Sequence, residues 1–170
     1  STIASPDNGP NGSPNATLAS GPWSYASSVG EILASATYDV TNESGVVRNR
    51  VKEYKALADK MPAVELYLYE AGQHLIGIEP YLNAMFPLFS ACNADPGMGT
   101  LYTLYLNMLQ DEEVSLACMY RGTTGWSRHS MFGLQEYYNQ VTRPKYDAIL
   151  AWLHTQTATF LNNVKYRLDI

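Results

Sequence analysis

The chain has 170 residues, 46% of them hydrophobic, which is enough to bury a substantial core in a single domain. The 11 basic residues are outnumbered by 16 acidic ones, the formal net charge is -5, and no basic cluster occurs along the sequence. We therefore expect no nucleic-acid partner. No apolar run approaches the roughly 20 residues that cross a bilayer, so we expect no membrane span.

The first quarter of the chain indicates a secreted, glycosylated protein. Residues 1–22 are rich in proline and glycine, which prevent continuous helix or strand pairing, so we expect an arm or long loop there. Three sequons predict N-glycosylation at Asn11, Asn15 and Asn42, and they favour a secreted or extracellular location. Because the chain begins at Ser1 without a leader, we expect a processed chain or a piece of a longer one.

Helices and strands are predicted to alternate along the first half of the chain. Residues 2–4 are either the end of a strand or part of a tail. Apolar residues at helical spacing predict helices over residues 27–38 and 45–61. Residues 64–70 are rich in aromatic and branched side chains and read as a buried strand.

The second half of the chain continues the same pattern. A loop containing Pro80 and Pro87 is expected to precede a helix whose N-cap is Asp95. Residues 114–120 predict a second buried strand, and Pro144 opens the last helix. The residues of this helix expected to face inward are Tyr146, Ile149, Leu150, Leu153 and Phe160.

This order of elements predicts an α/β fold, either a βα barrel or a doubly wound sheet. A complete eightfold barrel needs roughly 250 residues, so a full barrel does not fit. Glu70 is the most informative residue, because parallel α/β proteins present functional side chains where strands end. The alternative is a carboxylate that merely caps the strand.

The cysteines and histidines give weaker signals. Cys92 and Cys118 are compatible with one disulfide in an oxidising compartment, and two buried free thiols fit nearly as well. The histidines lack metal-ligand spacing, and the chain has no phosphate-binding or dinucleotide fingerprint. We therefore expect neither a metal nor a cofactor.

Four blocks of the sequence, in order, resemble the C-terminal part of secreted cellulase-like proteins of the clan A glycoside hydrolase superfamily. The blocks are Tyr69–Leu75; Asn93–Gly99 with Leu101, Tyr102, Tyr105 and Leu106; Gly125–Ser127 with Phe132–Tyr137; and Pro144–Ala148. The similarity covers about residues 46–153. Family members usually carry glycine where this chain has Ala71, which is a mild change.

The resemblance implies that residues 23–170 are the C-terminal portion of a (β/α)8 TIM-like barrel, about strands six to eight with their helices. It places Glu70 as the nucleophile at the end of the seventh strand. The acid/base glutamate of the superfamily lies on the fourth strand, which this chain does not contain. Retaining hydrolysis needs two carboxyl groups about 5 to 5.5 Å apart, so Glu70 supplies half of the mechanism.

We expect a sugar-binding mouth around Glu70. The residues expected to contact the substrate are Gln73, His74, Tyr120, Trp126 and Arg128. Trp126 follows the eighth strand, where the superfamily commonly has an aromatic platform beneath the sugar. The alternatives are that Trp126 packs in the core or a loop, that His74 is structural, and that Arg128 belongs to a solvated loop.

Two functions remain open. The first is a glycoside hydrolase-like protein that acts on or binds polysaccharide and is incomplete without the rest of the barrel. The second is a non-catalytic, glycosylated structural subunit of an extracellular assembly or filament. Both predict a partner besides carbohydrate, either a second polypeptide or further copies, because an open sheet exposes strand edges and apolar side chains.

Overall fold

The computed structural model describes residues 28–75, 85–127 and 130–168, with side chains described as far as residue 157. The elements of these residues are α2 (Val29–Thr41), α3 (Val46–Ala58), β1 (Tyr67–Ala71), α4 (Phe86–Ala94), α5 (Pro96–Asp111), β2 (Leu116–Met119) and α6 (Pro144–Leu168). Residues 1–22, with the predicted arm, the possible strand at residues 2–4, and the sequons of Asn11 and Asn15, lie outside the described part of the chain.

Two helices begin at residues whose side chains bind the free backbone N–H groups of the first turn. Ser28 and Glu31 form a capping box at α2, in which Ser28 Oγ accepts the Glu31 N–H at 3.2 Å and the Glu31 carboxylate accepts the Ser28 N–H at 2.6 Å. Asp95 Oδ1 accepts the Gly97 N–H at 2.7 Å at the start of α5. The N-cap predicted at Asp95 is therefore confirmed.

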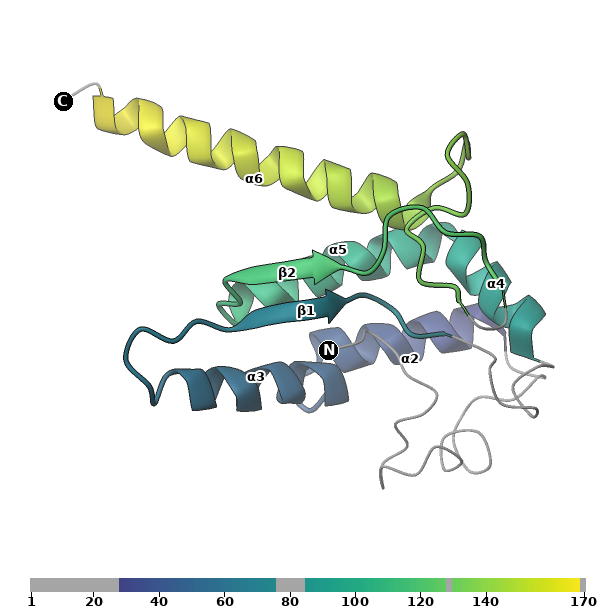
Figure 1. The fold of residues 1–170 in the computed structure, drawn as a ribbon, viewed down its shortest axis with the longest axis horizontal. Helices are drawn as coiled ribbons and strands as arrows, with labels where there is room; N and C mark the ends of the chain where they lie inside the picture. The colour runs from purple at the N-terminus through teal and green to yellow at the C-terminus, as the bar shows by residue number, and fades with distance from the viewer. Residues whose placement is uncertain (1–27, 76–84, 128–129, 169–170) are drawn as a thin grey trace.

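The strands β1 and β2 lie side by side and run parallel, as Figure 1 shows. Tyr67 pairs with Leu116, Leu68 with Ala117 and Ala71 with Met119. The register shifts between Leu68 and Ala71, so β1 has one residue more than β2 across this stretch, as in a β-bulge. The chain between the two strands contains α4 and α5, as expected of a parallel crossover connection.

The core lies between one face of this sheet and the helices. Leu68 and Ala71 point into it from β1, and α5 contributes the fully buried rings of Tyr102 and Tyr105. The helix α5 contacts α2, α4 and α6, so it is the central element of the fold. Other buried residues of the core are Ile32, Ala36, Val40, Val51, Leu75, Met85, Phe89, Met98, Leu101, Met108 and Met131.

The opposite face of the sheet is open in the described part of the chain. Tyr67, Tyr69 and Leu116 lie on it, and Tyr69 is 85% exposed. Successive strand residues point to opposite faces, so the buried Leu68 and the exposed tyrosines on either side of it define the two faces. A row of aromatic and aliphatic side chains is therefore left uncovered.

Helix α4 was not predicted, because Pro87 suggested a loop. Pro87 lies in the first turn of α4, where the N–H that proline lacks has no helical acceptor in any case. The proline therefore marks the start of a helix. The prediction of an entirely irregular segment here was wrong.

The last helix packs differently from the prediction. Leu150 and Leu153 are 39% and 49% exposed, so their predicted inward orientation is wrong, whereas Tyr146 and Ile149 pack against the core. Helix α6 lies along α5 and then extends beyond the other elements (Figure 1). The two leucines face a side that no described element covers. The Phe160 side chain lies outside the described part.

The described residues contain two parallel strands with helices between them, which agrees with the α/β class of the prediction. The larger TIM-like barrel stays a prediction.

Candidate functional site

A hollow of about 260 Å³ lies where β1 and β2 end. Its lining residues are Glu70, Ala71, Gly72, Gln73, His74, Tyr120 and Phe132. The chain places it at the carboxyl ends of both parallel strands, since Glu70 lies near the end of β1 and Tyr120 follows β2. Functional side chains usually gather at this edge of a parallel sheet.

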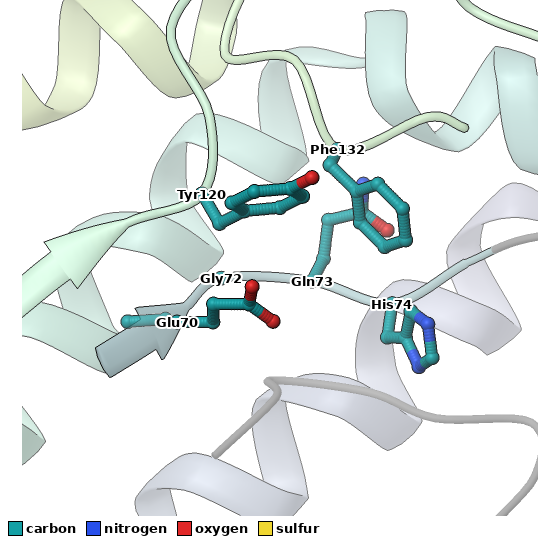
Figure 2. A pocket seen from close by; sticks show the side chains of 7 residues that line it. Glu70, Gly72, Gln73, His74, Tyr120 and Phe132 are labelled. Atoms are coloured by element: carbon teal, nitrogen blue, oxygen red, sulfur yellow. The ribbon is translucent and has the colours of Figure 1, made fainter. Parts of the chain in front are cut away.

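Glu70 is an exposed residue in the irregular part of the β1–β2 pairing. Its carboxylate is directed into the space between Tyr120 and His74 (Figure 2). Bulges often re-aim a side chain beside a functional site, and here both Tyr69 and Glu70 are exposed. Among the described residues that line the hollow, Glu70 supplies the only carboxylate.

An aromatic wall formed by Tyr120, Phe132 and His74 stands beside this carboxylate (Figure 2). The His74 and Phe132 rings are stacked, with centroids 5.1 Å apart and planes 20° apart. The Tyr120 and Phe132 rings meet edge to face at 5.4 Å. Phe132 was not predicted as a site residue, because it lies in a loop far along the chain from Glu70.

The backbone of Gly72 turns the chain out of β1. Its φ of 135° is one that side-chain-bearing residues rarely adopt. A Cβ at this position would lie 2.9 Å from the Tyr102 hydroxyl. Glycine is therefore required both by the backbone conformation and by the close approach of α5.

The Gln73 side chain is committed to protein partners. It is only 2% exposed, and its Nε2 donates to Asn93 Oδ1 at 3.0 Å and to the Met131 carbonyl at 2.5 Å. Its Oε1 accepts the Leu75 N–H at 2.5 Å. Gln73 lines the hollow, but its amide group mainly holds the segment after β1 in place.

Lys145 is a fully buried residue that the sequence did not single out for the site. Its Nζ donates to Asn93 Oδ1 at 2.7 Å and to the Met131 carbonyl at 3.2 Å. Burial lowers the pKa of the Lys145 ammonium group to about 7, because the charged form loses its hydration.

Trp126 does not line the hollow. Its ring faces Lys145, whose Nζ lies 5.2 Å from the ring centroid. Its indole N–H donates to the Gly133 carbonyl at 3.4 Å, and the side chain is half-buried. In this structure the aromatic surface beside Glu70 comes from Tyr120, Phe132 and His74, and Trp126 packs beside Lys145. A contact between Trp126 and a sugar stays a prediction.

The remaining predicted residues are placed as follows. Asn42 is exposed at the C-cap of α2, and its Oδ1 accepts the Ser44 N–H at 2.8 Å. Cys92 is buried on α4, Cys118 is exposed on β2, and both thiols are free, so the disulfide that the sequence allowed is not formed. Arg128 lies outside the described residues.

Within the described ranges, no group of three or more His, Cys, Asp or Glu residues could hold a metal ion. No helix in those ranges is long and apolar enough to cross a membrane. Comparison of the chain with protein-family models, curated protein sequences and solved structures finds no match.

Proposed function

We propose that this chain is a glycoside hydrolase-like protein that acts on or binds polysaccharide and needs further barrel strands to be complete. The observation that supports the proposal best is the Glu70 carboxylate at the end of a parallel strand, beside the aromatic wall of an open hollow. A pyranose ring presents apolar C–H groups to aromatic rings and hydroxyl groups to polar side chains. The hollow offers both kinds of contact.

In the catalytic version of this proposal, Glu70 is the nucleophile. Its carboxylate oxygen forms a bond to the anomeric carbon while the glycosidic C–O bond breaks and a second carboxylic acid protonates the leaving oxygen. The second group then takes a proton from water, which attacks the anomeric carbon and releases the sugar and the Glu70 carboxylate. In this proposal the second carboxyl group belongs to the fourth strand of the barrel, on a second polypeptide.

The open face of the sheet supports a partner that completes the barrel. Tyr67, Tyr69 and Leu116 expose apolar surface, and β1 and β2 present unpaired edges within the described part of the chain. We propose that a second polypeptide, or further copies of this chain, covers them. The assembly is proposed to be extracellular, with glycans at Asn42 and at the two N-terminal sequons.

The first experiment is the intact mass of the native particle, with peptide mapping of every chain in it. If a second polypeptide with the earlier strands is present, release of reducing ends from a panel of polysaccharides tests turnover. Glu70→Gln should abolish turnover, because the amide is a far weaker nucleophile. Glu53→Gln, on the exposed side of α3, is the control and should retain activity. Unchanged turnover in Glu70→Gln contradicts the catalytic role.

The second candidate function is a non-catalytic, glycosylated structural subunit of an extracellular assembly. It is favoured by the single carboxylate among the described residues of the hollow and by the apolar open face. If the native particle contains only copies of this chain and releases no reducing ends, this function replaces the first one.

A further inference from the structure

Four parts of the chain meet in a buried polar cluster behind the hollow. The cluster consists of Gln73 after β1, Asn93 on α4, Lys145 on α6 and the carbonyl of Met131. All four residues are buried. Helix α6 is thereby connected to the segment that carries the wall of the candidate site.

The lysine and the glutamine donate to the same two oxygen atoms. Asn93 Oδ1 accepts from both Gln73 and Lys145, and so does the Met131 carbonyl oxygen. The other end of the Asn93 amide is fixed as well, because its Nδ2 donates to the Phe89 carbonyl at 2.8 Å. Each acceptor oxygen therefore receives two hydrogen bonds, one from Gln73 and one from Lys145.

A buried ammonium group of this kind is a costly way to stabilise a fold. The two oxygen acceptors of Lys145 are uncharged, and the Trp126 ring is the third feature that its Nζ faces. Burying a charge beside neutral groups costs free energy, and an apolar side chain of the same length often serves stability equally well. The cluster is better explained by its effect on where neighbouring residues lie than by a gain in folding stability.

The positions concerned are those of the aromatic wall. Gln73 immediately precedes His74, and Met131 immediately precedes Phe132. The hydrogen bond from Gln73 Nε2 to the Met131 carbonyl thus lies directly beside the stacked His74 and Phe132 rings. Whatever holds the Met131 carbonyl against Gln73 also sets how these two rings meet.

We propose that Lys145 is a positioning residue, which fixes the Asn93 side chain and the Met131 carbonyl so that Gln73 holds His74 in register with Phe132 across the hollow. The proposal deepens the proposed function. It rests on that function only in taking the hollow to be a sugar-binding site. Its test is read without any glycan. If no glycan turnover is found, the positioning role of Lys145 is unaffected. If the positioning role fails its test, the role of Glu70 is unaffected.

The test replaces Lys145 by Met, which keeps the length of the side chain and removes its donors. NMR spectra of the whole chain in its native assembly report two quantities: the ring contacts between His74 and Phe132, and hydrogen exchange of the Leu75 amide, which is bound by Gln73 Oε1. We expect the ring contacts to weaken and Leu75 to exchange about tenfold faster relative to core amides of α5. Ile32→Val, in the core on α2, is the control and should accelerate Leu75 and the core amides equally.

Unchanged ring contacts and unchanged relative exchange of Leu75 in Lys145→Met overturn the proposal. If that variant does not fold, the unaltered protein decides between the outcomes. At mildly acidic pH the buried Lys145 ammonium protons should exchange slowly and show contacts with the Trp126 ring. Fast exchange of these protons with water contradicts the buried cluster and, with it, the positioning role.

Discussion

The Tyr102 hydroxyl accepts the backbone N–H of Gln73 at 3.2 Å and so joins the middle of α5 to the segment that leaves β1. Tyr102 is fully buried, and burial raises the pKa of its hydroxyl. The same oxygen approaches Gly72 so closely that no Cβ fits there. The floor of the hollow therefore depends on one tyrosine oxygen.

Removing that oxygen should destabilise the fold, although the aromatic ring stays in the core. Tyr102→Phe leaves the Gln73 N–H without its acceptor in a buried place, which costs about 1–3 kcal/mol in the free energy of unfolding. Urea unfolding measures the loss. Tyr54→Phe, on the exposed side of α3, is the matched control and should change little. Equal stability of the two variants contradicts the hydrogen bond.

Adding a single carbon at Gly72 should disturb the site more than its size suggests. Gly72→Ala imposes a side chain on a backbone with φ 135° and places Cβ against the Tyr102 hydroxyl, so we expect a loss of roughly 1–3 kcal/mol. Gly122→Ala is the control, because a Cβ there meets nothing within 4 Å. Thermal unfolding of both variants provides the comparison, and a Gly72→Ala midpoint at or above that of Gly122→Ala would disprove the constraint.

Stability should rise with pH above neutrality because of Lys145. Its pKa is about 7 in the folded chain and has its ordinary value of 10.5 when the chain unfolds. Between these values the unfolded state binds more protons, so the free energy of unfolding increases with pH, by at most about 1.4 kcal/mol per pH unit. Below pH 7 both states carry the proton and Lys145 adds no slope.

Cys92 opposes this rise at higher pH. Burial raises the pKa of its thiol from 9.0 to about 12, so the unfolded state loses its proton first and stability falls above about pH 9. The contribution of Lys145 is therefore clearest between pH 7 and 9. Urea unfolding at pH 7, 8 and 9 should show an increase in the unaltered protein and a flatter profile in Lys145→Met. If the free energy of unfolding changes equally with pH in both proteins, Lys145 does not cause the rise.

The two thiols should react at very different rates. Cys118 is exposed on β2, whereas Cys92 is fully buried with a raised pKa, and a thiolate is the reactive form. A thiol reagent should label Cys118 in the native protein and both cysteines after unfolding without reductant, as read by peptide mass spectrometry. If neither residue is labelled after unfolding, the cysteines form a disulfide.

Local sequence signals predicted much of the fold. Asp95 followed by proline identified the start of α5, and the apolar runs ending near Glu70 and Tyr120 identified both strands. These signals act between residues that are close in sequence, so they can be read without the fold. The same local reasoning missed α4, because Pro87 forbids the interior of a helix but is accommodated in its first turn.

The sequence by itself determined that an acid would lie at the end of a strand, since the order of apolar and polar residues around Glu70 fixes this locally. That the strand is buried on one face only, with Tyr67 and Tyr69 exposed on the other, was not predicted. Only the tertiary structure decided which residues surround Glu70. Phe132 reaches the hollow, and Lys145 reaches the polar cluster behind it, through long-range contacts. Lys145 Nζ lies 2.7 Å from Asn93 Oδ1 on another helix. Packing between distant segments sets such neighbours, and no spacing along the chain encodes them.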